Sequence, residues 1–169
     1  MNKEMLLSLV DRVIKVDRGG PESRYGKLLA AEEDHFILLT EDDGIIYYNT
    51  HHIKSLTVNA KNEVKLDFDI PRGLEYVKAE NFRGVVEKLR YRWVKINRGG
   101  PETLEGVMDV VNDDFITIVS NEEIVNLSMF HVRNISYGVK VEKANKGKGN
   151  NQEKGKENNK QTNAKKESE

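Results

Sequence analysis

Two short segments of identical sequence, Arg-Gly-Gly-Pro-Glu, carry the side chains best suited to polar chemistry in this chain. They comprise Arg18, Gly19, Gly20, Pro21 and Glu22, and eighty positions later Arg98, Gly99, Gly100, Pro101 and Glu102. Gly-Gly admits backbone angles closed to other residues and proline fixes the next φ, so each segment predicts a turn joining two strands. We expect the flanking Arg and Glu to be close enough to pair across the turn. Alternatively, either arginine could hold a carboxylate or a phosphate, or the twin turns could be contact points between neighbouring modules.

Two histidines, His52 and His131, are the second group of candidate residues. They occupy equivalent positions, each before the last predicted strand of its module, which indicates a capping or hydrogen-bonding role. No Asp, Glu or His recurs beside both of them with metal-ligand spacing, so we predict no metal site. The neighbour of His52, His51, has Phe130 as its counterpart, which weakens a metal site further.

The remaining polar residues do not indicate catalysis. The acidic clusters fall in predicted strand connections, where solvated turns explain them, and none presents a paired carboxylate suited to acid–base chemistry. The Gly-Gly-Pro turns lack the length and the following Lys-Ser/Thr of a phosphate-binding loop, and nothing matches a dinucleotide fingerprint. We therefore predict a protein that is not an enzyme, with no catalytic residues and no cofactor.

The matching turns belong to a longer internal repeat. Around the turns it covers residues 13–23 and 93–103, and it returns at Gly26 and Gly106 and at residues 52–56 and 131–135. Aligning Phe36 with Phe115 lowers the offset from 80 to 79, which places a one-residue deletion in the loop 31–34. The sequence therefore predicts two modules, residues 1–58 (repeat 1) and residues 82–139 (repeat 2).

Each repeat predicts a short helix followed by five strands. Apolar residues at three- and four-residue spacing mark the helix, as Leu6, Leu9 and Val10 do in repeat 1. Strands are expected at residues 13–17, 25–31, 35–40, 45–48 and 53–58, and at 92–97, 104–111, 115–120, 124–127 and 132–137. So many strands in so few residues require a strongly bent, barrel-like sheet. This order, with Gly26 opening the second strand and His52 entering the fifth, resembles the Sm-like fold. The fold class is therefore mainly β, with two tandem Sm-like barrels.

Composition separates an acidic body from a basic tail. Residues 140–169 contain almost no apolar side chain, which predicts a disordered tail. The tail holds nine Lys and five Glu, so the preceding residues carry a net charge of −5. That charge disfavours a dedicated nucleic-acid platform. Residues 59–81 are expected to be a linker, in which the alternating run 64–68 predicts an extra strand that could cover a sheet edge.

The repeated turns and the strand entries at His52 and His131 resemble the spore coat protein B family of endospore-forming bacteria. The resemblance covers nearly all of residues 5–139. It implies a non-enzymatic component of the outer spore coat, synthesised in the mother cell and assembled on the forespore surface. We expect this synthesis to need no signal peptide, because the apolar stretch at residues 5–10 is too short for one. Family members can carry a Ser/Lys-rich tail that is phosphorylated, whereas this tail offers only Thr162 and Ser168.

We therefore expect a structural coat protein whose two modules pair with each other through one sheet edge each. The remaining edges or the twin turns would join further copies and other coat proteins head to tail. Membrane insertion is not expected, because nothing approaches eighteen consecutive apolar residues. The alternative is an RNA-binding Sm-like regulator, favoured by the fold resemblance and the basic tail. The acidic body and the lack of a basic and aromatic cluster shared by both repeats argue against it.

Overall fold

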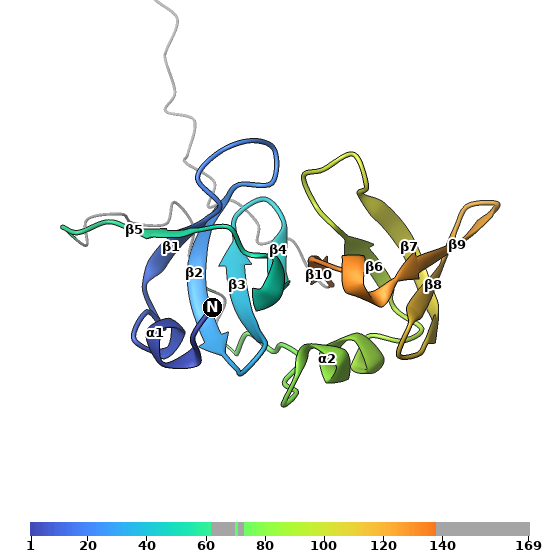
Figure 1. Ribbon diagram of the computed structural model, residues 1–169, viewed down its shortest axis with the longest axis horizontal. Coiled ribbons are helices and arrows are strands. Elements are labelled where there is room, and N and C mark those ends of the chain that lie inside the picture. The colour runs from blue at the N-terminus through green and yellow to red at the C-terminus, as the bar shows by residue number, and fades with distance from the viewer. Residues whose placement is uncertain (62–69, 71–72, 138–169) are drawn as a thin grey trace, which may run out of the picture.

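The computed structural model describes residues 1–61, 70 and 73–137 and confirms a mainly β fold (Figure 1). Repeat 1 contains α1 (Lys3–Leu7), β1 (Val13–Val16), β2 (Arg24–Ala31), β3 (His35–Thr40), β4 (Gly44–Asn49) and β5 (Leu56–Val58). Repeat 2 contains α2 (Phe82–Lys88), β6 (Trp93–Ile96), β7 (Leu104–Val111), β8 (Phe115–Ser120), β9 (Glu123–Ser128) and β10 (Asn134–Ser136). A short 3₁₀ turn precedes the last strand of each repeat, at Thr50–His52 and Met129–His131. The predicted strand at 64–68 and the predicted tail at 140–169 lie outside the described residues.

The ten strands of the described residues join one antiparallel sheet in the order β5-β1-β2-β3-β4-β10-β6-β7-β8-β9. This confirms the expectation that the two modules pair with each other through one sheet edge each. The expectation of two barrels needs correction, because the described sheet is continuous and open. The physical reason is that β4 of repeat 1 pairs with β10 of repeat 2, where a separate barrel would pair with itself. The two edge strands, β5 and β9, lie at opposite ends of the molecule (Figure 1).

The helices are short because the chain turns sharply soon after each one. Asn2 caps α1 by accepting a hydrogen bond from the Glu4 N–H, and Asn81 caps α2 in the same way through the Gly84 N–H. Past the helices, Asp11 and Tyr91 adopt positive φ angles of 69° and 64°. The periodic apolar residues that follow Leu7 therefore lie in turns and in β1, beyond the end of the helix.

The strand registers correct the position of the one-residue deletion. Leu28 pairs with Leu38 and Met108 pairs with Ile118, so the offset of 80 persists through β3 and β8. The hairpin that follows is one residue shorter in repeat 2, because Thr40 pairs with Gly44 whereas Ser120 pairs with Glu123. The deletion thus lies in the turn 41–43, and the counterpart of Phe115 is His35. A turn absorbs a change in length, whereas a shift inside a strand would turn every following side chain to the other face.

A shared core ties the two repeats together. Strand β3 is buried along its whole length, on both faces. One face packs with Leu6 and β1 in a core made by repeat 1 alone. The other face contributes Ile37 and Leu39 to a second core, which also contains α2 and the strands of repeat 2. Helix α2 lies beneath this contact, and its first N–H, from Phe82, donates to the Asp34 carboxylate at 2.8 Å (Figure 1). Repeat 2 therefore folds onto the outer face of repeat 1.

Candidate functional site

The candidate site lies where the two repeats meet, at the pair β4 and β10. Three residue pairs define the register: Ile46 with Ser136, Tyr47 with Ile135 and Tyr48 with Asn134. The Asn49 N–H extends the ladder by donating to the Arg133 carbonyl at 3.0 Å. Burial stabilises the same strand, because Tyr47 is 1% exposed and its hydroxyl accepts from the Val77 N–H at 2.8 Å. This burial raises the pKa of Tyr47 to about 12, so the phenol stays neutral.

The two Arg-Gly-Gly-Pro-Glu segments form the predicted connections, from β1 to β2 and from β6 to β7. A hydroxyl closes each turn: Ser23 donates to the Asp17 carbonyl at 2.6 Å, and Thr103 donates to the Asn97 carbonyl at 2.9 Å. The second turn rests against the first. A Cβ atom on Gly99 would lie 2.1 Å from the Pro21 carbonyl oxygen.

One charged residue of each turn, Glu22 in the first and Arg98 in the second, pairs with the other repeat, and the expected pairing across each turn does not occur among the described residues. Glu22 binds Arg133 of repeat 2 through one carboxylate oxygen and Lys54, at 3.1 Å, through the other. Arg98 reaches back to Asp43 of repeat 1. Glu22 and Arg98 thus bind residues of the other repeat, whereas Arg18 and Glu102 form no ion pair among the described residues.

Both interrepeat ion pairs are partly shielded from water. The Arg98 and Asp43 side chains are 13% and 14% exposed. Burial lowers the pKa of Arg98 from its usual value, and Asp43 opposes that shift. The hydrogen bond from Arg133 lowers the pKa of Glu22 below 4.5, so this carboxylate is charged at neutral pH. The junction therefore combines a backbone ladder with two charge-assisted contacts.

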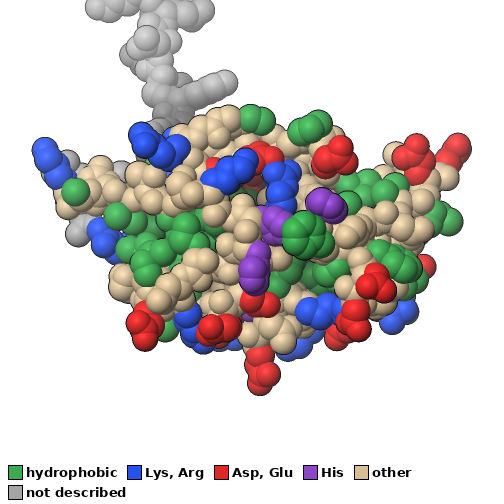
Figure 2. Space-filling model, viewed as in Figure 1, with side chains coloured by type: hydrophobic (Ala, Val, Ile, Leu, Met, Phe, Trp, Pro, Cys, Tyr) green, Lys and Arg blue, Asp and Glu red, His purple; other side chains and the backbone are tan. Residues whose placement is uncertain are grey.

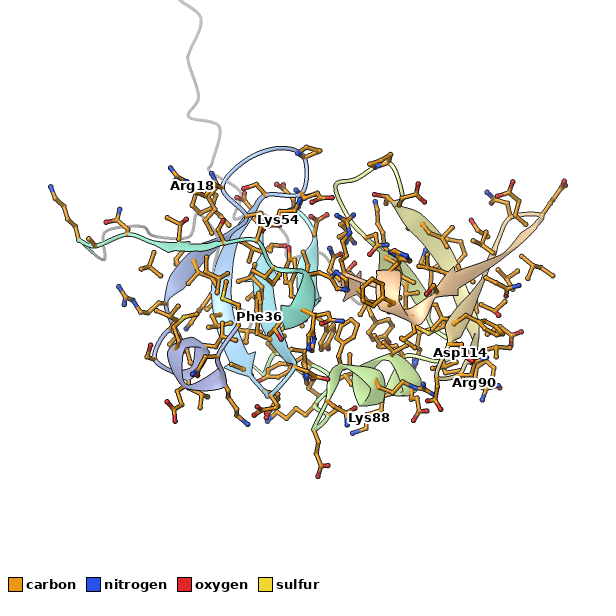
Figure 3. The ribbon with its side chains drawn as sticks, in the orientation of Figure 1. Arg18, Phe36, Lys54, Lys88, Arg90 and Asp114 are labelled. Carbon is orange, nitrogen blue, oxygen red and sulfur yellow. The ribbon has the colours of Figure 1, made fainter. Side chains whose placement is uncertain are left out.

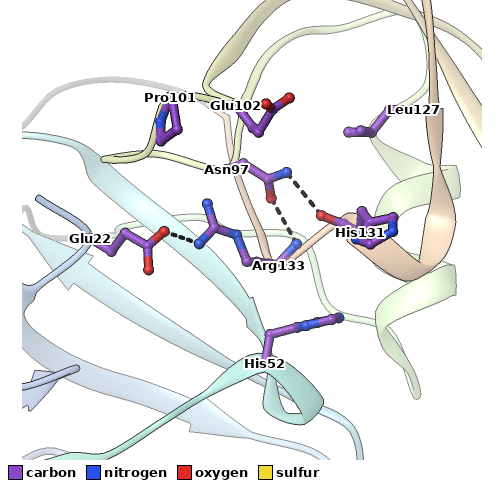
Figure 4. Close-up of a pocket in the computed structure, with 8 residues that line it drawn as sticks. All are labelled: Glu22, His52, Asn97, Pro101, Glu102, Leu127, His131 and Arg133. Carbon is purple, nitrogen blue, oxygen red and sulfur yellow. Dashed lines mark hydrogen bonds and ion pairs between the residues drawn. The ribbon is translucent and has the colours of Figure 1, made fainter.

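An open pocket of about 500 Å³ lies beside these contacts (Figure 4). Its walls come from both repeats: Glu22, His52, Asn97, Pro101, Glu102, Leu127, His131 and Arg133. Asn97 organises one wall, because its side-chain amide donates to the His131 carbonyl at 2.9 Å and accepts from the Arg133 N–H at 2.8 Å. The counterpart of Asn97 in repeat 1, Asp17, accepts from the Lys54 N–H at 3.0 Å in the same way.

The histidines surround an exposed aromatic ring at the same place. The centroid of the Phe130 ring lies 5.5 Å from that of His52 and 5.2 Å from that of His131. In Figure 2 the histidine side chains gather at the middle of the face, where the repeats meet. Burial lowers the pKa of His52 below 6.5, which favours the neutral ring. His131 takes part in the Asn97 network through its backbone carbonyl, and a binding role for either ring stays a prediction.

The pocket gathers five of the residues singled out from the sequence: Glu22, His52, Pro101, Glu102 and His131. Pro21, Arg98, Gly99 and Gly100 lie in the adjoining contact between the repeats, whereas Arg18, Gly19 and Gly20 do not line the pocket. The sequence reasoning missed Asp43, Asn97 and Arg133. One signal was available for Arg133, because a basic residue stands at the same position in repeat 1, as Lys54.

The arrangement supplies backbone pairing and ion pairs, which are the contacts of an assembly joint. Among the described residues, no group of three His, Asp or Glu side chains is placed to hold a metal ion. No helix in the described part of the chain is long and apolar enough to span a membrane.

Comparison with known proteins identifies a relative. The chain is 37% identical to spore coat protein B of Bacillus subtilis (strain 168) over 132 residues, which make up 78% of this chain and 34% of that protein. The chain is therefore homologous to spore coat protein B and spans about a third of its length. This homology confirms the resemblance inferred from the repeated turns. No protein-family model matches the sequence, and no solved structure matches it.

Proposed function

From this homology we propose that the chain is a structural, non-enzymatic component of the bacterial endospore coat, acting in the outer layer by protein–protein assembly. In this proposal the protein is made in the mother-cell cytoplasm and is deposited on the forespore. Its partners are other coat proteins and further copies of itself.

The observation that supports this proposal most directly is the joint between the repeats. Repeat 1 and repeat 2 associate through a strand pair, β4 with β10, and through the ion pairs of Glu22 and Arg98. Edge-to-edge pairing of this kind extends a sheet from one unit to the next. The chain thus contains within itself one example of the contact that a coat would need many times.

The proposal extends to the architecture of the two repeats. Each repeat has the strand order β5-β1-β2-β3-β4 or its equivalent, β10-β6-β7-β8-β9, with a helix before the first strand. We take residues 1–58 and 82–139 to be Sm-like modules, joined by the linker 59–81. A bulge at the same place in β2 and β7 supports this assignment, because bulges bend strands and a small bent sheet needs one.

The test is localisation in a sporulating Bacillus. The full chain is fused to a fluorescent protein and expressed in the mother cell, and mature spores are fractionated to separate the coat. We expect a fluorescent ring around the forespore and recovery of the chain in the coat fraction. Diffuse fluorescence in the mother cell, with the chain absent from purified spores, would refute the proposal.

An RNA-binding role is separated from this one by a second measurement. Purified full chain is mixed with single-stranded RNA at low and high salt, because phosphate contacts weaken as salt increases. A coat component without an RNA site shows no binding once residues 140–169 are removed. Salt-sensitive binding that survives this deletion would favour the RNA-binding alternative.

A further inference from the structure

We propose that this protein assembles head to tail, with β9 of one chain pairing with β5 of the next in the register of the inner β4–β10 pair. The inference rests on the proposed function and specifies its self-association. Both strands are edges of the described sheet, and they lie at opposite ends of it (Figure 1). One chain therefore cannot join its own two edges, but a neighbouring chain can.

The internal repeat makes the two outer edges the counterparts of the two joined strands. Strand β9 is the counterpart of β4, and β5 is the counterpart of β10. Each outer strand already pairs on one side in the same way as its counterpart. Strand β5 pairs with β1 as β10 pairs with β6, and β9 pairs with β8 as β4 pairs with β3. The expected pairs across the new joint are Val125 with Thr57, Asn126 with Leu56 and Leu127 with Ser55. When one surface of a chain binds a different surface of the next identical chain, the contact repeats and produces a ring or a filament.

Repeat 2 covers an apolar surface of repeat 1, and the equivalent surface of repeat 2 is exposed to solvent. Leu39 and Ile45 are 0% and 7% exposed because α2 and the second core pack on them. Their counterparts, Val119 and Ile124, are 37% and 72% exposed. The counterpart of His35 is Phe115, and it is exposed too. An apolar surface of this kind is typical of an interface.

Helix α1 offers the matching cover. Val85 of α2 is fully buried in the core between the repeats. Its counterpart in α1 is Met5, which is 39% exposed, and Leu7 beside it is 49% exposed. In a head-to-tail assembly α1 of the next chain would lie over β8 and β9 as α2 lies over β3 and β4.

The four residues that form the two ion pairs of the β4–β10 joint have counterparts of the same charge at the outer edges. Glu22 and Arg133 correspond to Glu102 and Lys54, and Asp43 and Arg98 correspond to Glu122 and Arg18. The acidic members lie at the β9 end and the basic members at the β5 end, so the two ends attract each other. Among the described residues Arg18, Glu102 and Glu122 form no ion pair, and all three are exposed. Figure 3 shows Arg18 on the side of its turn that faces away from repeat 2.

Gly19 supplies an independent argument. Its counterpart, Gly99, must be glycine, because φ is 88° there and a Cβ would meet the Pro21 carbonyl of repeat 1. Gly19 itself has nothing within 4 Å of such a Cβ, and the positive φ of its turn falls on Gly20. Nothing within the described part of the chain requires glycine at position 19. A neighbouring chain whose Pro101 rests there would require it.

The test is sedimentation equilibrium of the purified full chain over a wide range of concentrations. We expect the average mass to increase with concentration. The variants Arg18→Glu and Glu122→Arg each place like charges across the joint, so each should weaken association by about tenfold or more. Mixing them in equal amounts should restore assembly, because every joint then pairs opposite charges. Asp109→Lys, which changes an exposed charge on the interior strand β7, is the matched control and should assemble as the wild type does.

Gly19→Ala keeps the test independent of folding. Its added Cβ meets open space in the single chain, so the variant should unfold as the wild type does yet fail to assemble. A wild type that stays monomeric at every concentration, or a charge-reversal mixture as weak as its two components, would overturn the inference. So would normal assembly of Gly19→Ala. If the wild-type chain is monomeric in solution but still locates to the spore coat, the proposed function stands and only head-to-tail assembly fails.

Discussion

The two glycine turns give a direct test of the joint, because the repeat provides its own control. Gly99→Ala and Gly19→Ala make the same substitution in nearly the same sequence. Gly99 has a φ of 88° and lies against the Pro21 carbonyl, whereas Gly19 lies in open space. We predict that only the first substitution destabilises the single chain.

The size of the effect follows from two costs. An L-residue at a left-handed φ costs roughly 1–2 kcal/mol relative to glycine. The Cβ would also lie 2.1 Å from a backbone oxygen that cannot rotate away, so the two turns must separate. Overpacking of this kind costs roughly 1–3 kcal/mol. The free energy of unfolding of Gly99→Ala should therefore fall by about 2–5 kcal/mol.

The assay is equilibrium urea unfolding followed by far-ultraviolet circular dichroism, at a protein concentration where the wild type is monomeric. Gly19→Ala should match the wild type or gain up to about 1 kcal/mol, because alanine restricts the unfolded chain. If Gly99→Ala unfolds at the wild-type urea concentration, the turns do not touch as described. Equal losses of unfolding free energy in both variants would show that each glycine is needed only for the conformation of its own turn.

Three further substitutions probe the junction by urea unfolding. Tyr47→Phe removes the acceptor of the Val77 N–H and should cost about 1–2 kcal/mol; an unchanged midpoint would refute that hydrogen bond. Burial lowers the pKa of His52 below 6.5, so the unfolded chain binds its proton more readily and wild-type stability falls as the pH drops below that value. His52→Gln should show a smaller decline, and an identical pH profile would contradict this. Glu22→Gln should cost about 1 kcal/mol at neutral pH. This difference should vanish as the pH falls below 4.5 through the lowered pKa of Glu22, and a difference that persists in acid would argue against the pair with Arg133.

The strand positions could be predicted because local pattern decides them. Alternating and β-branched residues marked each of the ten strands in the described part of the chain, and Gly-Gly-Pro marked the connections that the structure shows. The deletion was misplaced because the dipeptide Phe-Ile occurs at Phe36 and Phe115, one step out of register. Only the cross-strand pairs distinguish a short turn from a shifted strand.

Edge-to-edge pairing of the two modules could be predicted, but the side chains that meet at the joint could not, because they lie far apart in sequence. Glu22 and Arg133 lie 111 positions apart, and nothing local to either residue selects the other. Arg and Glu at the ends of one short turn therefore gave a plausible but wrong pairing. The useful signal was the comparison of the repeats, since the charges at Glu22 and Arg133 recur with the same signs at Glu102 and Lys54.

Differences between the repeats separate a permanent joint from a reversible one. At the inner joint Tyr47 is buried on β4, whereas at the same place on β9 the residue is Asn126, which is exposed. The two joints share one kind of cation, since Arg98 corresponds to Arg18, but the other differs. It is Arg133 at the inner joint, whose planar guanidinium can bind a carboxylate through two hydrogen bonds, and Lys54 at the outer edge, a hydrated point charge. Obligate interfaces are more apolar than transient ones. The outer joint therefore depends more on charge, and increasing salt should separate chains before it separates the repeats within a chain.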